Sequence, residues 1–497
     1  MKSNLRLNPN PVVRYLDKEP DQIRKADLMR FIAENEIRMV NFMYPADDNR
    51  LKTLNFVINS EEYLDSILTF GERVDGSSLF PFIKAGNSDL YVIPRYSTAF
   101  VDPFAEIPTL TMLASFFDNS GNPLDSSPQY TLHKSADAFR NTTGMDFYAM
   151  GELEYYVIAD DPAVFSATDQ KGYHESSPFA KFNDFRTECM DIIARTGGQI
   201  KYGHSEVGNF TLDNKIFEQN EIEFLPVPAV EAADQLMIAK WVIRTLAARR
   251  GYDVTFAPKI TAGKAGSGLH IHFKIMKDGH NMMIDNGHLS DTAKKAIVGI
   301  LTHAGALTAM GNKVPTSYFR LVPNQEAPTS ICWGDRNRSV LVRVPLGWTG
   351  GKDMCSQVNP LESEYTADPE RQTVELRSAD GSANVYQLIA GIIAAARSGF
   401  LMPEALDKAA DLYVSVDIHK DKEKLAQLNS LPDSCYASSE ALKADREVFE
   451  CDGVFSPDMI QSIIDRQHDY RDKHLRENVI DNKQEMLQLV KKYWHCG

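Results

Sequence analysis

Residues 265–272 read Ala-Gly-Ser-Gly-Leu-His-Ile-His, so that two histidines alternate with two large apolar residues. A spacing of two is that of a β-strand, and it places His270 and His272 on one face. Leu269 and Ile271 then lie on the other face. The glycines before them let the backbone come close to a bound substrate. A strand with two ordinary hydrogen-bonded histidines would show the same pattern, so its meaning depends on the rest of the chain.

Glutamates recur in the same way on four other strand-like, apolar runs. Within 147–158 and within 219–225, two glutamates stand two residues apart and share one face of a strand. Charged side chains on the inner face of an apolar strand are costly unless they are paired or bind a cation. For any one run, an edge strand with a solvated face is a sufficient explanation. The set of interest is Glu152, Glu154, Glu206, Glu221, His270 and Glu375.

Five carboxylates and one imidazole form an oxygen-rich set that favours Mg²⁺ or Mn²⁺, whereas Zn²⁺ would call for more Cys or His. So many carboxylates on one face cannot all stay ionised without cations, because like charges raise one another's pKa. Planar guanidinium groups suit phosphate and carboxylate oxygens. Metal ligands and arginines together indicate phosphoryl transfer, and the chain has no Walker A loop. The candidate arginines, each of which alone would pass for a surface residue, are Arg320, Arg338, Arg343 and Arg377.

The composition excludes several classes of partner. The net charge of -15 argues against a nucleic-acid surface. The six cysteines form no C-x-x-C pair, which favours free thiols in a reducing compartment. The N-terminus shows no apolar signal segment, and the most apolar run, 385–401, carries polar residues typical of a buried helix. We therefore expect a cytoplasmic protein that binds no membrane.

The order of patterns predicts three units: an N-terminal segment and helix over 1–36, a strand-rich domain over 37–125 and a catalytic domain over 126–497. A polar stretch at 118–129 is the expected linker. The periodicity predicts helices at 135–143, 185–195, 232–250 and 293–309, and one long polar helix over 457–493.

Seven short motifs, each weak to moderate alone, follow one another along the chain. These are Asp75-Gly76-Ser77-Ser78, Gly151-Glu152-Leu153-Glu154, Gln219-Asn220-Glu221, Gly266-Ser267-Gly268-Leu269-His270-Ile271-His272, Arg320-Leu321-Val322-Pro323-Asn324-Gln325-Glu326-Ala327-Pro328, Arg336-Asn337-Arg338-Ser339 and Val374-Glu375-Leu376-Arg377. Their order is that of the bacterial type I glutamine synthetase family, which the chain therefore resembles. The resemblance implies an α+β fold, with an N-terminal β-grasp domain and a glutamine synthetase/guanido kinase-like catalytic domain built on a curved antiparallel sheet. It also implies a dodecamer of two stacked hexameric rings whose active sites are shared between neighbours.

The resemblance further implies two or more divalent ions and a set of residue roles. The ligands of one ion, beside glutamate and ammonia, are Glu154, Glu206 and Glu221. The ligands of the other, on the ATP phosphates, are Glu152, His270 and Glu375. Arg338 and Arg343 neutralise the γ-phosphate, and His272 lies on the nucleotide side. Glutamate is oriented by Arg320, Arg377 and the Gly266 backbone. Glu326, on a mobile lid, helps to deprotonate ammonium, which Asp75 of the adjacent subunit attracts.

The sequence departs from the family pattern in ways that bear on substrate and ATP. Ala265 replaces the family's asparagine before the Gly-Ser-Gly run, and Thr373 replaces an arginine near the metal glutamate, with Arg371 as the candidate substitute. The stretches 207–220 and 346–372 are expected to be expanded loops. The wider spacing after Glu206 makes Glu218 and Glu223 alternative ligands to Glu221. Tyr413 lies near a modified tyrosine of some relatives, but its surroundings match those of an ordinary surface tyrosine better.

The resemblance predicts a ligase of nitrogen metabolism that uses ATP to join ammonia to the side-chain carboxylate of glutamate through γ-glutamyl phosphate. The products are glutamine, ADP and phosphate. Asp75 and Glu326 favour ammonia as the acceptor. The alternative is a γ-glutamyl ligase for another amine, a polyamine or a monoamine, which Ala265 and the two expanded stretches support. A third hypothesis is a scaffold or regulatory protein that keeps the fold but has no catalytic activity. Such a protein is expected to have lost metal ligands, whereas all six are present in this sequence.

Overall fold

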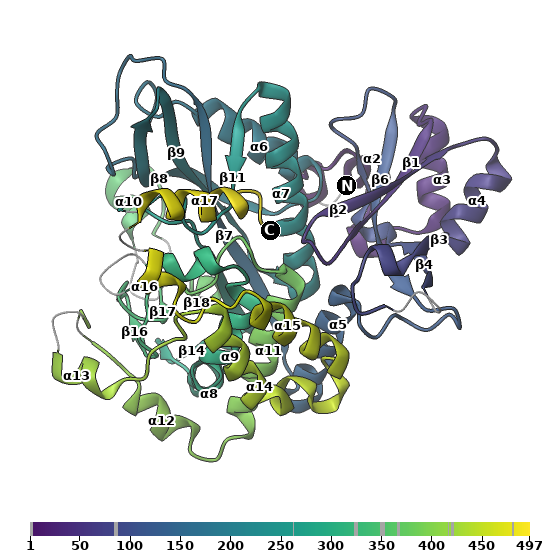
Figure 1. Ribbon diagram of the computed structural model, residues 1–497. Coiled ribbons are helices and arrows are strands. Elements are labelled where there is room, and N and C mark those ends of the chain that lie inside the picture. The colour runs from purple at the N-terminus through teal and green to yellow at the C-terminus, as the bar shows by residue number, and fades with distance from the viewer. Residues whose placement is uncertain are drawn as a thin grey trace.

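The computed structural model describes residues 3–83, 88–261, 263–322, 327–347, 353–364, 368–415, 417–418, 422–479 and 482–497. Figure 1 shows a smaller N-terminal part beside a larger part that holds the rest of the chain. Each part encloses a hydrophobic core of its own. The helices before residue 36 pack on the same core as the N-terminal sheet. Both parts combine mixed sheets with helices, which confirms the α+β class.

The N-terminal sheet has the strand order β2-β1-β6-β4-β3, with β5 paired to β6. Only β1 and β6 run parallel, and the other pairs are antiparallel. Its strands are β1 (Met39–Pro45), β2 (Leu51–Val57), β3 (Glu72–Asp75), β4 (Asp89–Pro94), β5 (Phe100–Val101) and β6 (Thr109–Phe117). Its helices are α1 (Ser3–Arg6), α2 (Pro11–Leu16), α3 (Lys25–Glu34) and α4 (Glu61–Phe70).

The large sheet has the order β16-β17-β18-β12-β7-β9-β8, with β10 and β11 on β7 and β13 on β12. All of these pairs are antiparallel except β16 with β17. The strands are β7 (Asp146–Asp160), β8 (Ile200–Leu212), β9 (Lys215–Phe224), β10 (Val227–Pro228), β11 (Asp253–Thr255), β12 (Leu269–Lys277), β13 (His280–Asn281), β16 (Trp333–Asp335), β17 (Val342–Val344) and β18 (Val374–Leu376). A separate small sheet joins β14 (Ile284–Asp285) to β15 (His288–Leu289).

Helices pack against the large sheet and extend to the end of the chain. They are α5 (Pro128–Thr143), α6 (Asn183–Arg195), α7 (Ala229–Arg250), α8 (Asp291–Thr302), α9 (Ala304–Gly311), α10 (Met354–Val358), α11 (Val385–Leu401), α12 (Ala405–Asp411), α13 (Lys422–Gln427), α14 (Cys435–Glu450), α15 (Pro457–Asp469), α16 (Leu475–Val479) and α17 (Lys483–Lys492). Among the described residues no single helix is long and apolar enough to cross a membrane, and only the bent pair α11 and α12 passes that test together.

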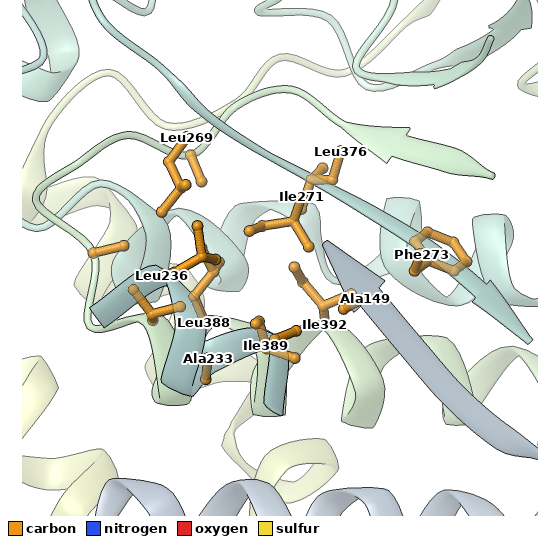
Figure 2. Packing of buried hydrophobic residues seen from close by; sticks show 14 of the residues in the cluster. Ala149, Ala233, Leu236, Leu269, Ile271, Phe273, Leu376, Leu388, Ile389 and Ile392 are labelled. Carbon is orange, nitrogen blue, oxygen red and sulfur yellow. The ribbon is translucent and has the colours of Figure 1, made fainter. Parts of the chain in front are cut away.

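The alternation in β12 determines which side chains enter the core. Figure 2 shows Leu269, Ile271 and Phe273 of β12 beside Leu236 of α7 and Ile392 of α11. All five side chains are fully buried. Each contributes about 1.5–3 kcal/mol relative to an exposed position. Burying these three β12 residues on the helix side leaves the histidines between them on the opposite face.

Three predictions of secondary structure are wrong, and the largest correction concerns the end of the chain. The single helix predicted over 457–493 is three helices, α15 to α17. The chain breaks after α15 at Arg471, whose φ is 52°. The Asp472 carboxylate then accepts hydrogen bonds from the backbone N–H groups of Cys435 and Tyr436 at 2.9 and 3.0 Å. This side chain thereby satisfies the start of α14, which a continuous helix would not allow.

The other corrections concern residues 207–220 and 293–309. The first stretch is not a loop, because it belongs to the β8–β9 hairpin, whose turn residues Asp213 and Asn214 have φ values of 50° and 62°. Positive φ at both positions is typical of the tight turns that join antiparallel strands. The second stretch is two helices, separated at His303, whose Nδ1 lies 2.9 Å from Asp445.

Candidate active site

Strand register brings the predicted acidic and histidine residues together on the face opposite the helices. His270 of β12 lies across from Glu152 of β7, and His272 lies across from Glu375 of β18. Glu152 in turn lies across from Glu223 of β9. Directly opposed side chains in adjacent strands are within contact distance of one another. Glu223, Glu152 and His270 therefore form a first row across the strands, and His272 and Glu375 lie beside it on the same face.

Glu152 is held between the two imidazoles. Its Oε2 lies 2.8 Å from Nδ1 of His270 and its Oε1 lies 2.8 Å from Nε2 of His272. His270 Nδ1 also lies 3.5 Å from Oε1 of Glu375. Burial alone raises the pKa of Glu152, but His272 and His270 outweigh it and hold that pKa well below its usual range. Burial lowers the pKa of His272, but Glu152 outweighs this and raises it. The group therefore forms an ion-paired network when no cation is present.

The neighbouring row across the strands, here called the second row, contains carboxylates whose negative charges are not balanced by two histidines in this way. Glu154 of β7 lies across from Glu221 of β9, which lies across from His204 of β8. His204 Nε2 is 3.2 Å from Glu221 Oε1, and its Nδ1 is 4.0 Å from Glu206. Burial, followed by Glu152 and Glu154, raises the pKa of Glu221 well above its usual range. Burial and the Glu154 carboxylate raise the pKa of Glu206 to about 7. The carboxylates of this row are therefore stabilised by binding either protons or cations.

The two alternative ligands are placed differently. Glu223 shares the face of Glu221, but its oxygens accept from Lys201 Nζ at 2.5 Å and from the Tyr202 hydroxyl. Glu218 lies three positions before Glu221 on β9 and so belongs to the other face. Its carboxylate accepts from the backbone N–H groups of residues 181 and 182 at 2.7 and 3.2 Å. Glu218 is thus engaged away from the cluster.

The predicted arginines lie along the β17–β18 side of the cluster. Arg343 and Arg377 both donate to Glu375, at 2.9 and 3.0 Å, and this carboxylate is buried between them. Arg320 donates to the carbonyls of residues 378 and 379 at 2.8 and 3.2 Å and lies 3.3 Å from Nε2 of His270. The positive charge of Arg338 lowers the pKa of Glu206, so the Arg338 guanidinium lies close enough to the second row to act on this carboxylate. All four arginines are therefore near the ligand set.

The glycines of the Gly-Ser-Gly run are required by close packing. A Cβ on Gly266 would lie 2.5 Å from the Pro258 carbonyl oxygen, and one on Gly268 would lie 2.5 Å from the Arg320 guanidinium. The backbone N–H of Gly268 donates to Glu154 Oε2 at 2.7 Å. The Gly-Ser-Gly backbone therefore lies beside the site and also orients Glu154, one of the predicted metal ligands.

Ala265 and Thr373, at which the sequence departs from the family pattern, each contact residues near the site. The Ala265 backbone N–H donates to the Gln170 side-chain oxygen at 2.7 Å, and its carbonyl accepts from the Tyr156 hydroxyl at 2.9 Å. The Thr373 hydroxyl lies 3.0 Å from Nδ1 of His272. Because the other nitrogen of His272 faces Glu152, Thr373 helps to orient this imidazole.

The structure does not bring Asp75 into the cluster. Asp75 is on the N-terminal sheet, where its carboxylate accepts from the hydroxyls of Ser77 and Ser78 at 2.7 Å each. Among the described residues, no hydrogen bond or ion pair joins Asp75 to the cluster. Glu326 lies outside the described residues. Tyr413 packs on Trp333 and its hydroxyl donates to Asp335 at 3.2 Å.

His204 is not among the ligands predicted from the sequence, yet it contacts two of them. The signal for it was present, because His204 stands two residues before Glu206 and so shares its face. The ring of His174 lies 4.2 Å from the His204 ring and 4.2 Å from the Tyr173 ring. Tyr173 and His174 come from an irregular segment, and no local pattern indicated that they would meet β8.

The donor set fits hard divalent cations. Among the residues that the structure describes, donor atoms within 4.8 Å of one another occur in three groups, each dominated by carboxylates, as Mg²⁺ and Mn²⁺ require. The groups are Glu152, Glu221 and His270; Glu152, His272 and Glu375; and His204, Glu221 and Glu223. The predicted division into two ligand triplets differs from these groups, since Glu152 and Glu221 were assigned to different ions.

Comparison with known proteins tests the resemblance directly. The sequence model described as "Glutamine synthetase, catalytic domain" matches residues 125–486, and "Glutamine synthetase, beta-Grasp domain" matches residues 36–119. The chain belongs to the glutamine synthetase family. This confirms the predicted family and the predicted β-grasp and catalytic domains.

Members of the family with different names resemble the chain to a similar degree. Glutamine synthetase of Frankia alni is 30% identical, over 88% of this chain and 93% of its own length. A 3-hydroxylaminophenol mutase of Cupriavidus pinatubonensis is 29% identical, over 88% and 94%. Two solved structures share the glutamine synthetase fold. A GmaS/ADP complex has a TM-score of 0.72 at 22% identity, covering 91% of this chain and 99% of its own. The Plasmodium falciparum glutamine synthetase has a TM-score of 0.74 at 18% identity, covering 91% and 97%.

Proposed function

We propose that this protein is a glutamate–ammonia ligase. The observation that carries the proposal is the convergence of the five predicted carboxylates and three histidines on one face of the large sheet, with four arginines beside them. In the proposed reaction, an oxygen of the glutamate side-chain carboxylate attacks the γ-phosphorus of ATP and ADP leaves. Ammonia then attacks the acyl carbon of γ-glutamyl phosphate, phosphate leaves, and a carboxylate of the site takes the released proton.

The cluster is suited to positioning and charge neutralisation, which supply most of the catalysis in phosphoryl transfer. Bound Mg²⁺ or Mn²⁺ would neutralise phosphate oxygens as the γ-phosphoryl group is transferred. We assign the six predicted ligands to these ions, with His204 as a further candidate. Arg343 and Arg338 are proposed to face the γ-phosphate, and His272 the nucleotide side. Arg377, Arg320 and the Gly266 backbone are proposed to orient glutamate, with Arg320 acting partly through the segment it holds at residues 378 and 379.

Ammonia is favoured as the acceptor because the chain retains Asp75 and Glu326. Asp75 is exposed on the N-terminal sheet, so it is available to the active site of a neighbouring subunit. Hydrogen bonds from the Ser77 and Ser78 hydroxyls lower the pKa of Asp75 to about 2, which keeps it anionic and able to attract ammonium. We therefore propose a homo-oligomer with shared sites, a dodecamer of two stacked hexameric rings, in the cytoplasm.

The second candidate is a γ-glutamyl ligase for another amine. It is supported by Ala265, which takes the place of the family's asparagine, and by the aromatic stack of Tyr173, His174 and His204 beside the second row of carboxylates. Such a stack could accommodate an organic cation better than ammonium.

The test is release of ADP and phosphate by the purified protein with ATP, Mg²⁺ and glutamate. Ammonium is compared with a panel of monoamines and polyamines at equal concentration, and Glu221→Gln serves as the control for activity that depends on the cluster. Preference for ammonium supports the ligase proposed first, and preference for an amine supports the second candidate. Turnover without ADP release would contradict both, because an isomerisation consumes no ATP.

A further inference from the structure

A second polar cavity lies away from the cluster, between the N-terminal sheet and the end of the chain. Its volume is about 340 Å³, and its walls come from the β1–β2 turn, the segment after α9, the end of α15 and the residues from α17 onward. The turn is docked on the large domain, because Asn49 donates to the Ser382 carbonyl at 3.1 Å. The Arg50 guanidinium donates to the His495 carbonyl at 3.0 Å.

The lining is strongly cationic on a chain whose net charge is -15. It carries five lysine or arginine side chains and two aspartates. Asp48 pairs with Lys52 at 2.5 Å, and Asp47 pairs with Arg466. The cationic lining residues are Arg50, Lys313, Arg466, Lys491 and Lys492. The local excess of positive charge is therefore not neutralised by the acids of the wall.

Lys313 is the most informative residue of this cavity. It is only 7% exposed, and the hydrogen bond recorded for its Nζ is a long one, 3.4 Å, to the amide oxygen of Gln387. No described carboxylate forms an ion pair with it within 4.0 Å. Burial, followed by repulsion from Arg466, lowers the pKa of Lys313 to about 8, and attraction to Asp47 offsets this only in part, so Lys313 remains mostly charged at neutral pH. A buried ammonium with so little compensation is costly unless an anion completes the site.

We propose that this cavity binds a small multivalent anion bearing phosphate or carboxylate groups. Lys313 lies at its buried end and Arg466 beside it, while Lys491 and Lys492 lie on its exposed rim. The anion would bridge the β1–β2 turn and the C-terminal segment. Nothing in this proposal depends on the reaction proposed for the cluster, and the two sites are lined by different residues.

The cavity is connected to the segment that holds Arg320. The Lys313 backbone N–H donates to the Ser382 hydroxyl at 2.9 Å, and that hydroxyl lies 2.6 Å from Asp380. Asn312 donates to the Ser378 carbonyl, which also accepts from Arg320, at 2.8 Å each. An anion on Lys313 would therefore contact the same segment that supports the proposed glutamate side of the site.

The test is isothermal titration of the metal-free full-length chain, without ATP or glutamate, in a buffer that lacks multivalent anions. Pyrophosphate is the phosphate probe, citrate is the carboxylate probe and chloride is the monovalent reference. Lys313→Met keeps the side-chain length and removes the charge, and Lys443→Met on the exposed surface of α14 is the matched control. Arg343→Met removes an arginine of the cluster, which is the other place where pyrophosphate could bind.

We expect at least one multivalent probe to bind the wild type more tightly than chloride does, and to raise its thermal midpoint. Binding should weaken at least tenfold in Lys313→Met and stay unchanged in Lys443→Met and Arg343→Met. Comparison of the two probes identifies the preferred anionic group. If Lys313→Met does not fold, the double variant Lys491→Ser, Lys492→Ser at the rim should weaken binding several-fold. No binding to the wild type, or a loss of binding in Arg343→Met alone, would overturn the proposal.

Discussion

Replacing Glu206 by glutamine should stabilise the metal-free protein. Burial and the Glu154 carboxylate raise the pKa of Glu206 from its usual 4.5 to about 7, and its side chain is only 18% exposed. A carboxyl whose pKa is higher in the folded state than in the unfolded state destabilises the fold as pH rises from the lower pKa to the higher one. The unfolded state loses its proton freely over this range, whereas the folded state either keeps the proton or holds an unfavourable charge. The penalty is about 1 kcal/mol near pH 5.5 and about 3 kcal/mol at pH 7.

Glutamine has nearly the same shape and can still accept the hydrogen bond from the Val207 backbone N–H, which is 2.7 Å long. The variant Glu206→Gln should therefore gain up to about 3 kcal/mol at pH 7, and clearly less near pH 5.5. The proposed metal ligand would be lost at the same time. Saturating Mg²⁺, which stabilises a binding protein by about 2.7 kcal/mol at a hundredfold excess over its Kd, should stabilise the variant less than the wild type.

The assay is urea unfolding followed by circular dichroism, with chelator or with Mg²⁺, near pH 5.5 and pH 7. Glu447→Gln, on the exposed surface of α14, is the matched control and should change stability by less than about 0.5 kcal/mol at either pH. If Glu206→Gln destabilised the metal-free protein at pH 7, or if its effect were the same at both pH values, like-charge crowding in the second row would be refuted.

Four further outcomes are expected, two from the contacts of Glu375 and Ile271 and two from the roles proposed for Asp75 and Glu326. Glu375→Gln should destabilise the metal-free protein by about 3 kcal/mol in urea unfolding, because the guanidinium groups of Arg343 and Arg377 lose their counter-charge. A loss of stability below about 1 kcal/mol would contradict that pairing. Ile271→Ala should cost about 3 kcal/mol in the same measurement through the cavity it leaves under β12, and a negligible cost would mean that the core collapses around it. Asp75→Ala should raise the KM for ammonium more than the KM for glutamate, and an equal rise would count against its role. Glu326→Ala should lose most of its turnover but keep ATP binding by titration, and unchanged turnover would exclude it as the base.

Much of the site was predictable because strand periodicity is a local property. A spacing of two positions, with one residue between Glu152 and Glu154 or between His270 and His272, is enough to place both side chains on one face. The apolar residues between them identify which face is buried. The ordered motifs then predicted the family, which the matches confirm. The assignment of individual ions and substrates to these residues stays a prediction.

Other features depend on contacts between distant segments, which no local pattern specifies. Residue 204 joins the cluster because the β8–β9 register sets it across from Glu221, and Glu223 is occupied because Lys201 and Tyr202 lie next to it. The helix predicted over 457–493 breaks because Asp472 binds the start of α14, far away in sequence.

The sequence by itself determined which residue types share a face, the α+β class and the family, since these follow from spacing and motif order. Only the tertiary structure decided which opposite charges meet. The pKa of Glu152 is lowered and that of Glu221 is raised, although both are glutamates on adjacent strands with less than an eighth of the side chain exposed. The physical reason is that a charge in a buried site responds to neighbours within a few ångströms, and strand register selects those neighbours.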